Sequence, residues 1–233
     1  MTSLTSVAMT TFPASSASEG LLERVRANLA RIYERIEASG RDRTSVRVIA
    51  VTKTFGVDEI HAALALGLTT FGENYVDELC DKRKVIDDPS LSWHYLGALQ
   101  TNKIARAASC ADVLCAVARE KELTRIAALA PGKFVDIQID FTGLAQRNGA
   151  APDDVARLVE RARALDLYVR GLMVVAPLGE PAARAAFVKT NALANELGVT
   201  ERSMGMSDDL EIACELGSTE VRLGRALFGP RVA

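Results

Sequence analysis

Residues 46–53 read VRVIAVTK, a short apolar run that ends on a lysine. Valine and isoleucine dominate the run, which is typical of a strand buried on both faces of a parallel sheet. Side chains alternate along a strand, so Ile49, Val51 and Lys53 share one face. If that face points into a barrel, the amine of Lys53 lies at the C-terminal edge of the strands, where parallel barrels place their chemistry.

A strand followed by a helix recurs along the rest of the chain. Apolar runs predict strands at residues 46–53, 69–74, 92–97, 113–117, 133–140, 168–176, 202–206 and 221–228. Helical spacing predicts helices at residues 18–39, 58–66, 76–86, 101–108, 120–130, 153–165, 182–197 and 210–216. We expect the helix after the last strand to be missing or very short.

Alternation of this kind requires parallel strands joined by crossover helices, and eight such units close a TIM barrel. We therefore expect an α/β fold with a single (β/α)8 barrel at residues 18–233, in which the helix at 18–39 is an addition before the first strand. Residues 1–17, rich in Ser, Thr and Ala, are expected to form a flexible, disordered tail. An open doubly wound sheet is the structural alternative, but no G-x-G-x-x-G motif follows the first strand, which weakens a dinucleotide-binding interpretation.

Charge and hydropathy exclude several classes of partner. The 28 basic and 30 acidic residues nearly cancel and no basic block stands out, so we expect no nucleic-acid and no membrane-surface partner. The N-terminus lacks the basic and apolar regions of a secretory signal, and no apolar run approaches the roughly 20 residues that cross a bilayer. We therefore expect a cytoplasmic protein, and we expect it to be a monomer.

Four cysteines are spread along the chain, with one C-x4-C pair among them: Cys80, Cys110, Cys115 and Cys214. No histidine follows that pair at the spacing of a zinc site, and the two histidines of the chain stand in separate segments. The sequence therefore predicts reduced thiols and no metal site.

An apolar wall around Lys53 would lower the pKa of its amine and keep the amine neutral, which is the state that attacks a carbonyl. A lysine in solvent at the rim of the barrel is the alternative, and for a lone lysine it is the better one. A second cluster of residues, at the ends of the last two strands, favours the reactive lysine over the rim lysine.

Residues 203–207, SMGMS, end the seventh predicted strand and lead into the helix that begins near Asp208. Backbone N–H groups at a helix start bind anions, and Gly205 would let a ligand approach the backbone closely. Gly224 on the eighth strand adds a second small residue, and barrels most often hold a phosphate in the loops after these two strands. An ordinary tight turn is the alternative, since Asp208 and Asp209 would repel a phosphate unless they face away.

A reactive lysine opposite a phosphate site suggests one ligand that carries both an aldehyde and a phosphate, and pyridoxal 5′-phosphate has both. Arg222 and Gly224 share a strand face, so Arg222 can point toward the pyridine nitrogen of that ligand. An arginine cannot accept a proton, so the nitrogen would stay unprotonated and the ring would be a weaker electron sink. A core ion pair with a strand carboxylate is the alternative for Arg222.

Further candidates come from other strands of the expected barrel. Asn74 could hydrogen-bond the ring hydroxyl, whereas His94 is more often a satisfied core histidine than a proton shuttle. Methionines such as Met173 would pack against a flat ring. The candidate residues for binding pyridoxal phosphate are therefore Lys53, Asn74, His94, Met173, Ser203, Met204, Gly205, Ser207, Arg222 and Gly224.

Several motifs together resemble the pyridoxal phosphate homeostasis protein family, also called the YggS or PROSC family, over nearly the whole chain after the tail. They are VTKTF (51–55), FGENYVDE (71–78), WHYLGALQTNK (93–103), GLMVVAP (171–177), SMGMSDDLEIACELGSTEVRLG (203–224) and FG (228–229). The resemblance implies one barrel similar to the N-terminal domain of alanine racemase, with the cofactor held on Lys53 as an internal aldimine. It also implies phosphate contacts from residues 203–207 and Gly224, and a place for Arg222 near the ring nitrogen.

Two departures from the family pattern stand out. Arg225 follows the R-L-G motif where members often carry a small hydroxylated residue, so it would either add charge at the phosphate or face outward. The loop at residues 141–149, FTGLAQRNG, differs from the usual pattern of lysine and glycine. Neither change touches Lys53 or the glycines of the expected phosphate site.

Racemisation by a pyridoxal enzyme needs acid–base groups on both faces of the substrate, and Lys53 supplies one. As the resemblance implies, alanine racemases take the opposite tyrosine from a second domain, for which we expect this chain to have no room. We therefore expect a protein without catalytic residues that holds and releases pyridoxal phosphate in vitamin B6 and amino-acid homeostasis, with pyridoxal-phosphate-dependent apoenzymes as recipients. A weak amino-acid racemase and a cofactor-free Schiff-base aldolase are the alternatives.

Overall fold

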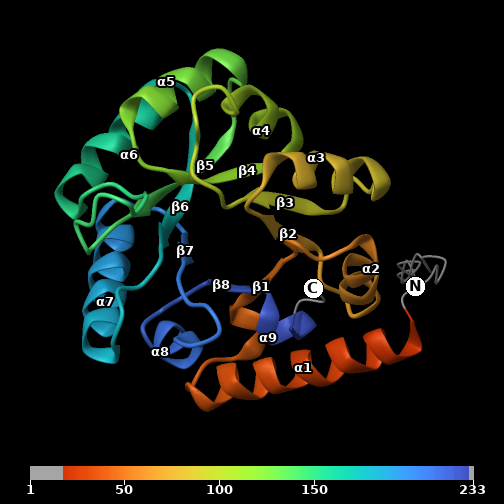
Figure 1. Cartoon of the computed structure of the whole chain (residues 1–233). Helices are drawn as coiled ribbons and strands as arrows, with labels where there is room; N and C mark the ends of the chain where they lie inside the picture. Colours follow the sequence, from red (N-terminus) through yellow and green to blue (C-terminus); the bar gives the residue numbers. More distant parts are fainter. Residues whose placement is uncertain (1–17, 231–233) are drawn as a thin grey trace, which may run out of the picture.

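A computed structural model describes residues 18–230 and shows a closed barrel of parallel strands with helices around it (Figure 1). The strands are β1 (Arg47–Val51), β2 (Thr70–Glu73), β3 (Ser92–Tyr95), β4 (Val113–Val117), β5 (Phe134–Ile139), β6 (Tyr168–Val174), β7 (Glu201–Ser203) and β8 (Glu220–Leu223). They follow one another around the barrel in chain order, and β8 pairs with β1 to close it. The predicted (β/α)8 barrel is confirmed, and the open doubly wound sheet is wrong.

Helices surround the barrel, and each strand leads into one of them (Figure 1). Their bounds are α1 (Glu19–Ala38), α2 (Val57–Ala65), α3 (Val76–Val85), α4 (Ile104–Cys110), α5 (Glu120–Leu129), α6 (Val155–Ala164), α7 (Glu180–Glu196), α8 (Leu210–Glu215) and α9 (Arg225–Phe228). Two short 3-10 turns, η1 (Arg43–Ser45) and η2 (Pro152–Asp154), precede β1 and α6. The predicted helices are confirmed, with small shifts at their ends.

The last predicted strand needs a correction. β8 ends at Leu223, and residues 225–228 form α9 instead of continuing the strand to Phe228. Leu227 and Phe228 are buried, and the rings of Phe228 and Phe55 have their centroids 5.0 Å apart. A short apolar run fits a buried strand and a buried helical turn equally well, so periodicity could not separate them. α9 is the very short last helix that the alternation predicts.

α1 covers the part of the barrel that α9 is too short to cover. It packs against α2, α8 and α9, beside the strands that close the barrel (Figure 1). Its buried side chains recur at helical spacing: Leu21, Val25, Leu29, Ile32 and Ile36. The side chain of Asn28 donates a 3.0 Å hydrogen bond to the carbonyl of Leu227 in α9. The extra N-terminal helix is therefore an integral part of the helical layer.

Alternation along β1 separates an inner face of the barrel from an outer face. Val48 and Ala50 belong to the hydrophobic core between the barrel and the helices. Val51 and Lys53 instead line a cavity at the end of the barrel, and Ile49 has the same parity. The predicted shared face of these three residues is therefore the inner face.

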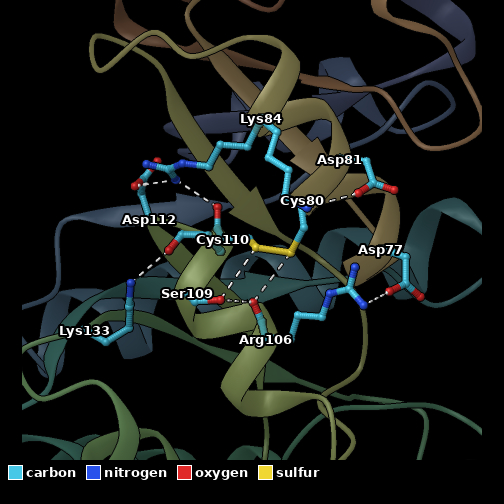
Figure 2. Close-up of a disulfide and its surroundings, with 11 residues drawn as sticks. Asp77, Cys80, Asp81, Lys84, Arg106, Ser109, Cys110, Asp112 and Lys133 are labelled. Carbon is cyan, nitrogen blue, oxygen red and sulfur yellow. Dashed lines mark hydrogen bonds and ion pairs between the residues drawn. A yellow bond between two sulfur atoms is a disulfide. The ribbon is translucent and has the colours of Figure 1, made fainter.

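Cys80 of α3 and Cys110 at the end of α4 form a disulfide, with their Cα atoms 5.2 Å apart (Figure 2). The prediction of reduced thiols is wrong for this pair, whereas Cys115 and Cys214 are free and buried. The two bonded cysteines are 30 residues apart on neighbouring helices, and only the folded barrel brings those helices together.

Within residues 18–230, no helix combines the length and the apolar character that a membrane span needs. Over the same range, no three His, Cys, Asp or Glu side chains gather as a metal site requires. The predicted tail at residues 1–17 lies outside the described part of the chain.

Removing the disulfide is expected to destabilise the oxidised protein. Closing a loop between cysteines 30 residues apart restricts the unfolded chain, so Cys110→Ser should lower the free energy of unfolding by about 3 to 4 kcal/mol. Urea unfolding of the wild type and the variant, each with and without dithiothreitol, measures the difference. Reductant should destabilise the wild type alone. Four reactive thiols in unreduced, denatured wild type would contradict the bond, which leaves only Cys115 and Cys214 free.

Candidate functional site

A cavity of about 560 Å³ opens at the C-terminal end of the barrel. This volume lies within the range of small-molecule sites, about 300 to 1,000 Å³. Several of the predicted binding residues line it: Lys53, Asn74, Met173, Ser207, Arg222 and Gly224. The structure therefore brings together, at the end of the barrel, residues from both halves of the sequence.

Lys53 lies two residues beyond the end of β1, half-buried in the wall of this cavity. Its neighbours Val51 and Phe55 are apolar, buried and part of the same wall. Lys53 is therefore neither a fully exposed rim lysine nor a core residue. A lysine in such a position can reach a ligand in the cavity while its apolar surroundings limit contact with water.

Arg222 of β8 is only 6% exposed and also lines the cavity. Its guanidinium donates to the carbonyl of Ser203 at 2.5 Å, to the Ser203 hydroxyl at 3.0 Å and to the carbonyl of Val174 at 2.7 Å. Burial lowers the pKa of this guanidinium, but an arginine stays charged. Its hydrogen-bond partners within residues 18–230 are neutral, so the alternative of a core ion pair is wrong.

A separate cluster of charges lies elsewhere in the barrel interior. Arg170 of β6 pairs with Asp136 of β5 and with Glu220 of β8, each at 2.7 Å, and both carboxylates are fully buried. Arg47 of β1 pairs with Glu220 as well. Glu220 precedes Arg222 by two positions on the same strand face, so this cluster forms the layer of the barrel below Arg222.

His94 belongs with that lower layer, and the structure does not bring it to the cavity. It is 1% exposed, and its Nε2 atom lies 3.1 Å from the Ser92 hydroxyl. Burial lowers the pKa of His94 to about 3, and the charged groups that act on it include Arg170 and Glu220. His94 is therefore a neutral core histidine instead of a residue at the mouth.

Gly224 and Ser207 lie at the ends of the neighbouring strands β8 and β7, on the cavity wall. A Cβ atom at Gly224 would lie 3.1 Å from the carbonyl oxygen of Val51, so the adjacent strand leaves little room for a side chain. Within the described chain, no hydrogen bond uses the backbone N–H groups of Ser207, Asp208 or Gly224. Such N–H groups beside a cationic side chain are the usual elements of an anion site.

The two acidic residues before α8 take different positions. Asp209 accepts a 2.6 Å hydrogen bond from the backbone N–H of Met206, whereas Asp208 lines the cavity. The predicted repulsion of a phosphate therefore concerns Asp208. Three cationic side chains lie on the same wall to offset its charge: Lys53, Arg222 and Arg225.

Three predicted site residues lie behind the cavity wall: Ser203, Met204 and Gly205. Ser203 holds Arg222 through two hydrogen bonds, and Met204 is buried in a cluster with Ala213 of α8. Gly205 has a φ of 96°, and a Cβ atom there would lie 2.7 Å from the Cβ of Ala213. The glycine is therefore needed for a left-handed turn and for close packing of α8.

Sequence reasoning missed Gln138 of β5, which lines the cavity. Its side-chain amide donates to the carbonyl of Asn148 at 2.7 Å and accepts from the Asn148 side chain at 2.8 Å. Gln138 has the same parity as the buried Asp136, so alternation along β5 could have identified it. The other lining residues absent from the prediction are Val51, Phe55, Leu96, Val175, Met206, Asp208 and Arg225.

Both departures from the family pattern lie beside the cavity. Arg225 at the start of α9 is exposed and lines the cavity wall, so it does not simply face outward. In the loop at residues 141–149, Arg147 donates to the carbonyls of Val175 and Ala176 at 3.4 and 3.3 Å. Arg225 and this loop are therefore placed to influence what the cavity binds.

Comparison with known proteins agrees with this geometry. A sequence model of the family described as alanine racemase, N-terminal domain, matches residues 21–232. A pyridoxal phosphate homeostasis protein of Pseudomonas aeruginosa is 39% identical over 220 residues, which cover 91% of this chain and 96% of that protein. The structure of PipY from Synechococcus elongatus with PLP bound is 34% identical, with a TM-score of 0.73, and the match covers 85% of this chain and 100% of that one.

The barrel is shared more widely than the sequence. Alanine racemase from Corynebacterium glutamicum is 17% identical with a TM-score of 0.72, and the match covers 91% of this chain and 62% of that enzyme. At this identity the similarity shows the fold alone. The family model and the Pseudomonas relative, in contrast, each span most of this chain. The chain therefore belongs to the alanine racemase N-terminal domain family and, within it, to the pyridoxal phosphate homeostasis proteins.

Proposed function

We propose that this protein carries pyridoxal 5′-phosphate as a Schiff base on Lys53 and serves intracellular pyridoxal phosphate (vitamin B6) and amino-acid homeostasis. The observation that supports this best is that one cavity contains the amine of Lys53, the guanidinium of Arg222 and Gly224, and that the hydrogen-bond partners of Arg222 within residues 18–230 are neutral. The relatives add support, since the Pseudomonas protein bears the name of a homeostasis protein and PipY was solved with PLP bound.

The residues present fit the two reactive ends of the cofactor. Lys53 would bind the aldehyde carbon, and the backbone N–H groups of Ser207 and Gly224 would bind the phosphate. Gly224 suits this role because its missing side chain leaves the backbone accessible from the cavity. Arg225 adds a positive charge at the same edge.

The ring would be held by residues from other strands. Met173 would pack on the ring, and Asn74 would hydrogen-bond the ring hydroxyl. Arg222 would face the ring nitrogen, where a donor that cannot accept a proton keeps the nitrogen neutral. Pyridoxal phosphate bound in this way supplies an electron-withdrawing ring, but a weaker electron sink than one whose nitrogen is protonated.

The cavity wall favours a carrier over an efficient racemase. Racemisation needs a second acid–base group across the substrate from the lysine. Among the described residues that line the cavity, none is a tyrosine, histidine or cysteine, and the one carboxylate, Asp208, directly follows Ser207 of the expected phosphate site. Pyridoxal-phosphate-dependent apoenzymes are the recipients that such a carrier would serve.

Replacing the lysine tests the Schiff base. Wild-type protein incubated with pyridoxal phosphate should show an absorbance band near the visible edge, and Lys53→Ala should lose that band because no other amine lines the cavity among the described residues. Lys121→Ala, at an exposed position of α5, is the matched control and should keep the band. A colourless wild type would reject the proposal, and borohydride trapping of a keto substrate on Lys53 would then favour the aldolase.

Arg225 is expected to strengthen binding of the phosphate through charge. Arg225→Ser should weaken the affinity for pyridoxal phosphate by roughly threefold to tenfold at low salt, and less at high salt, because the side chain is exposed. Fluorescence titration at two ionic strengths measures both effects. Arg31→Ser, at an exposed position of α1, should leave the affinity unchanged. An affinity of Arg225→Ser equal to that of the wild type would show that the guanidinium does not reach the phosphate.

The racemase alternative predicts exchange at the substrate α-carbon. Purified protein loaded with pyridoxal phosphate should exchange the α-deuterium of D- or L-alanine no faster than free pyridoxal phosphate does, because Lys53 supplies one acid–base group only. Proton NMR of the alanine α-position measures the exchange. Exchange well above the free cofactor that disappears in Lys53→Ala would establish the racemase instead.

A further inference from the structure

We propose that Lys82 of α3, together with Glu73 and Glu78, positions Lys53 for its bond to pyridoxal phosphate. None of the three lines the cavity, so they would act on the ligand only through the segment that carries Lys53. This role rests on the proposed function, and it names the residues that keep Lys53 in place for that ligand.

The Lys82 ammonium is buried, and each of its N–H groups has an acceptor. Lys82 is 7% exposed, and its Nζ atom donates to the carbonyl of Thr52 at 2.7 Å, to Oε1 of Glu73 at 2.5 Å and to Oε2 of Glu78 at 2.9 Å. An ammonium has three donors, so its capacity is filled. Lys82 therefore links the end of β1, the end of β2 and α3.

These contacts reach the peptide groups on both sides of Lys53. The carbonyl of Thr52, which accepts from Lys82, belongs to the peptide group before Lys53. The N–H of Thr54, in the peptide group after Lys53, donates to Oε2 of Glu78 at 2.9 Å. The same Glu78 oxygen accepts from Lys82, so one ion pair supports both anchors.

The side chain of Thr52 adds a further anchor. Thr52 is fully buried, and its hydroxyl donates to Oε1 of Glu73 at 2.8 Å. Its backbone N–H donates to the carbonyl of Gly72 at 2.9 Å. Thr52 faces the outer side of the barrel wall, where it meets α3, and the next residue, Lys53, faces the cavity.

The backbone after Lys53 needs such support. Thr54 has a φ of 64°, in the left-handed region that is costly for a β-branched residue. A strained residue persists only where its surroundings hold it, and the contact to its N–H comes from Glu78. Without the Glu78–Lys82 pair, Thr54 would be free to relax and Lys53 would shift with it.

A purely structural ion pair is the alternative, and two ligands separate it from a positioning role. In the proposed bond, the Lys53 nitrogen would attack the aldehyde carbon of pyridoxal 5′-phosphate, and a carbon–nitrogen double bond would form with loss of one water. Pyridoxine 5′-phosphate carries an alcohol in place of the aldehyde, so it can fill the cavity without bonding to Lys53. Misplacement of Lys53 should therefore weaken the binding of pyridoxal 5′-phosphate and leave the binding of pyridoxine 5′-phosphate unchanged.

The choice of variants follows from the burial of Glu73. Removing Lys82 alone would leave a buried carboxylate whose pKa burial already raises, so the main variant is Lys82→Met/Glu73→Gln. Glu78→Ala is a milder variant that removes the acceptor of the Thr54 N–H. Lys84→Met is the matched control, because Lys84 lies on the same helix and its side chain is 75% exposed.

Two quantities are measured below the melting temperature of every variant. They are the dissociation constant of each ligand and the rate at which the visible band appears with pyridoxal phosphate. The double variant should weaken pyridoxal phosphate binding and slow the band by about tenfold or more, because small errors in placing a nucleophile are costly. Its affinity for pyridoxine 5′-phosphate should stay within about twofold of the wild type. Glu78→Ala should also weaken the binding of pyridoxal phosphate more than that of pyridoxine 5′-phosphate, but by a smaller factor. Lys84→Met should match the wild type for both ligands.

Two results in the folded double variant would overturn the positioning role. One is an equal loss of affinity for both ligands, and the other is unchanged pyridoxal phosphate binding. If the double variant does not fold, the same two outcomes in Glu78→Ala decide the question. Absence of the band in both the wild type and Lys84→Met would reject the proposed function and this role with it.

Discussion

Pairing of β8 with β1 is the interaction on which the site depends. Its register places Arg222 beside Ile49, so Gly224 and Lys53, which follow on the same inner face, meet at one end of the barrel. These residues come from opposite ends of the sequence, and only a closed sheet makes them neighbours. The helical layer over this closing pair is unusual, because α9 is a single short turn and α1, from before the first strand, packs across it.

The interior of the barrel divides its charges between two layers. In the lower layer Arg170 and Arg47 pair with Asp136 and Glu220, whereas in the layer above it Arg222 is held by neutral oxygen atoms. A buried cation without a carboxylate loses the stabilisation of an ion pair, and it persists here because carbonyl groups satisfy its donors. The consequence is a positive charge at the cavity whose hydrogen-bond partners within residues 18–230 are neutral, which suits the binding of a ligand with an acceptor atom.

The outer side of the barrel wall supports the inner side. α3 is tied to α4 by the disulfide at Cys80, and two residues later Lys82 donates to the peptide group before Lys53. A helix that never touches the cavity thus bears on the residue proposed to bind the cofactor. Such an arrangement suits a carrier, in which one well-placed lysine has to hold and release a ligand without a second acid–base group across from it.

Much of this protein follows from its sequence alone, because the direction of each side chain depends on local periodicity. Apolar runs alternating with helical spacing determined the barrel, and the positions of Lys53, Arg222 and Gly224 at the ends of strands determined the centre of the candidate site. Residues whose roles the sequence did not decide include Cys80 with Cys110, His94, Gly205 and Gln138. Periodicity along a strand tells which face a side chain takes. Periodicity does not tell the layer of that side chain in the barrel, its distance from neighbouring helices or its partners. These depend on the register between strands and on closure of the sheet, which only the tertiary structure decides.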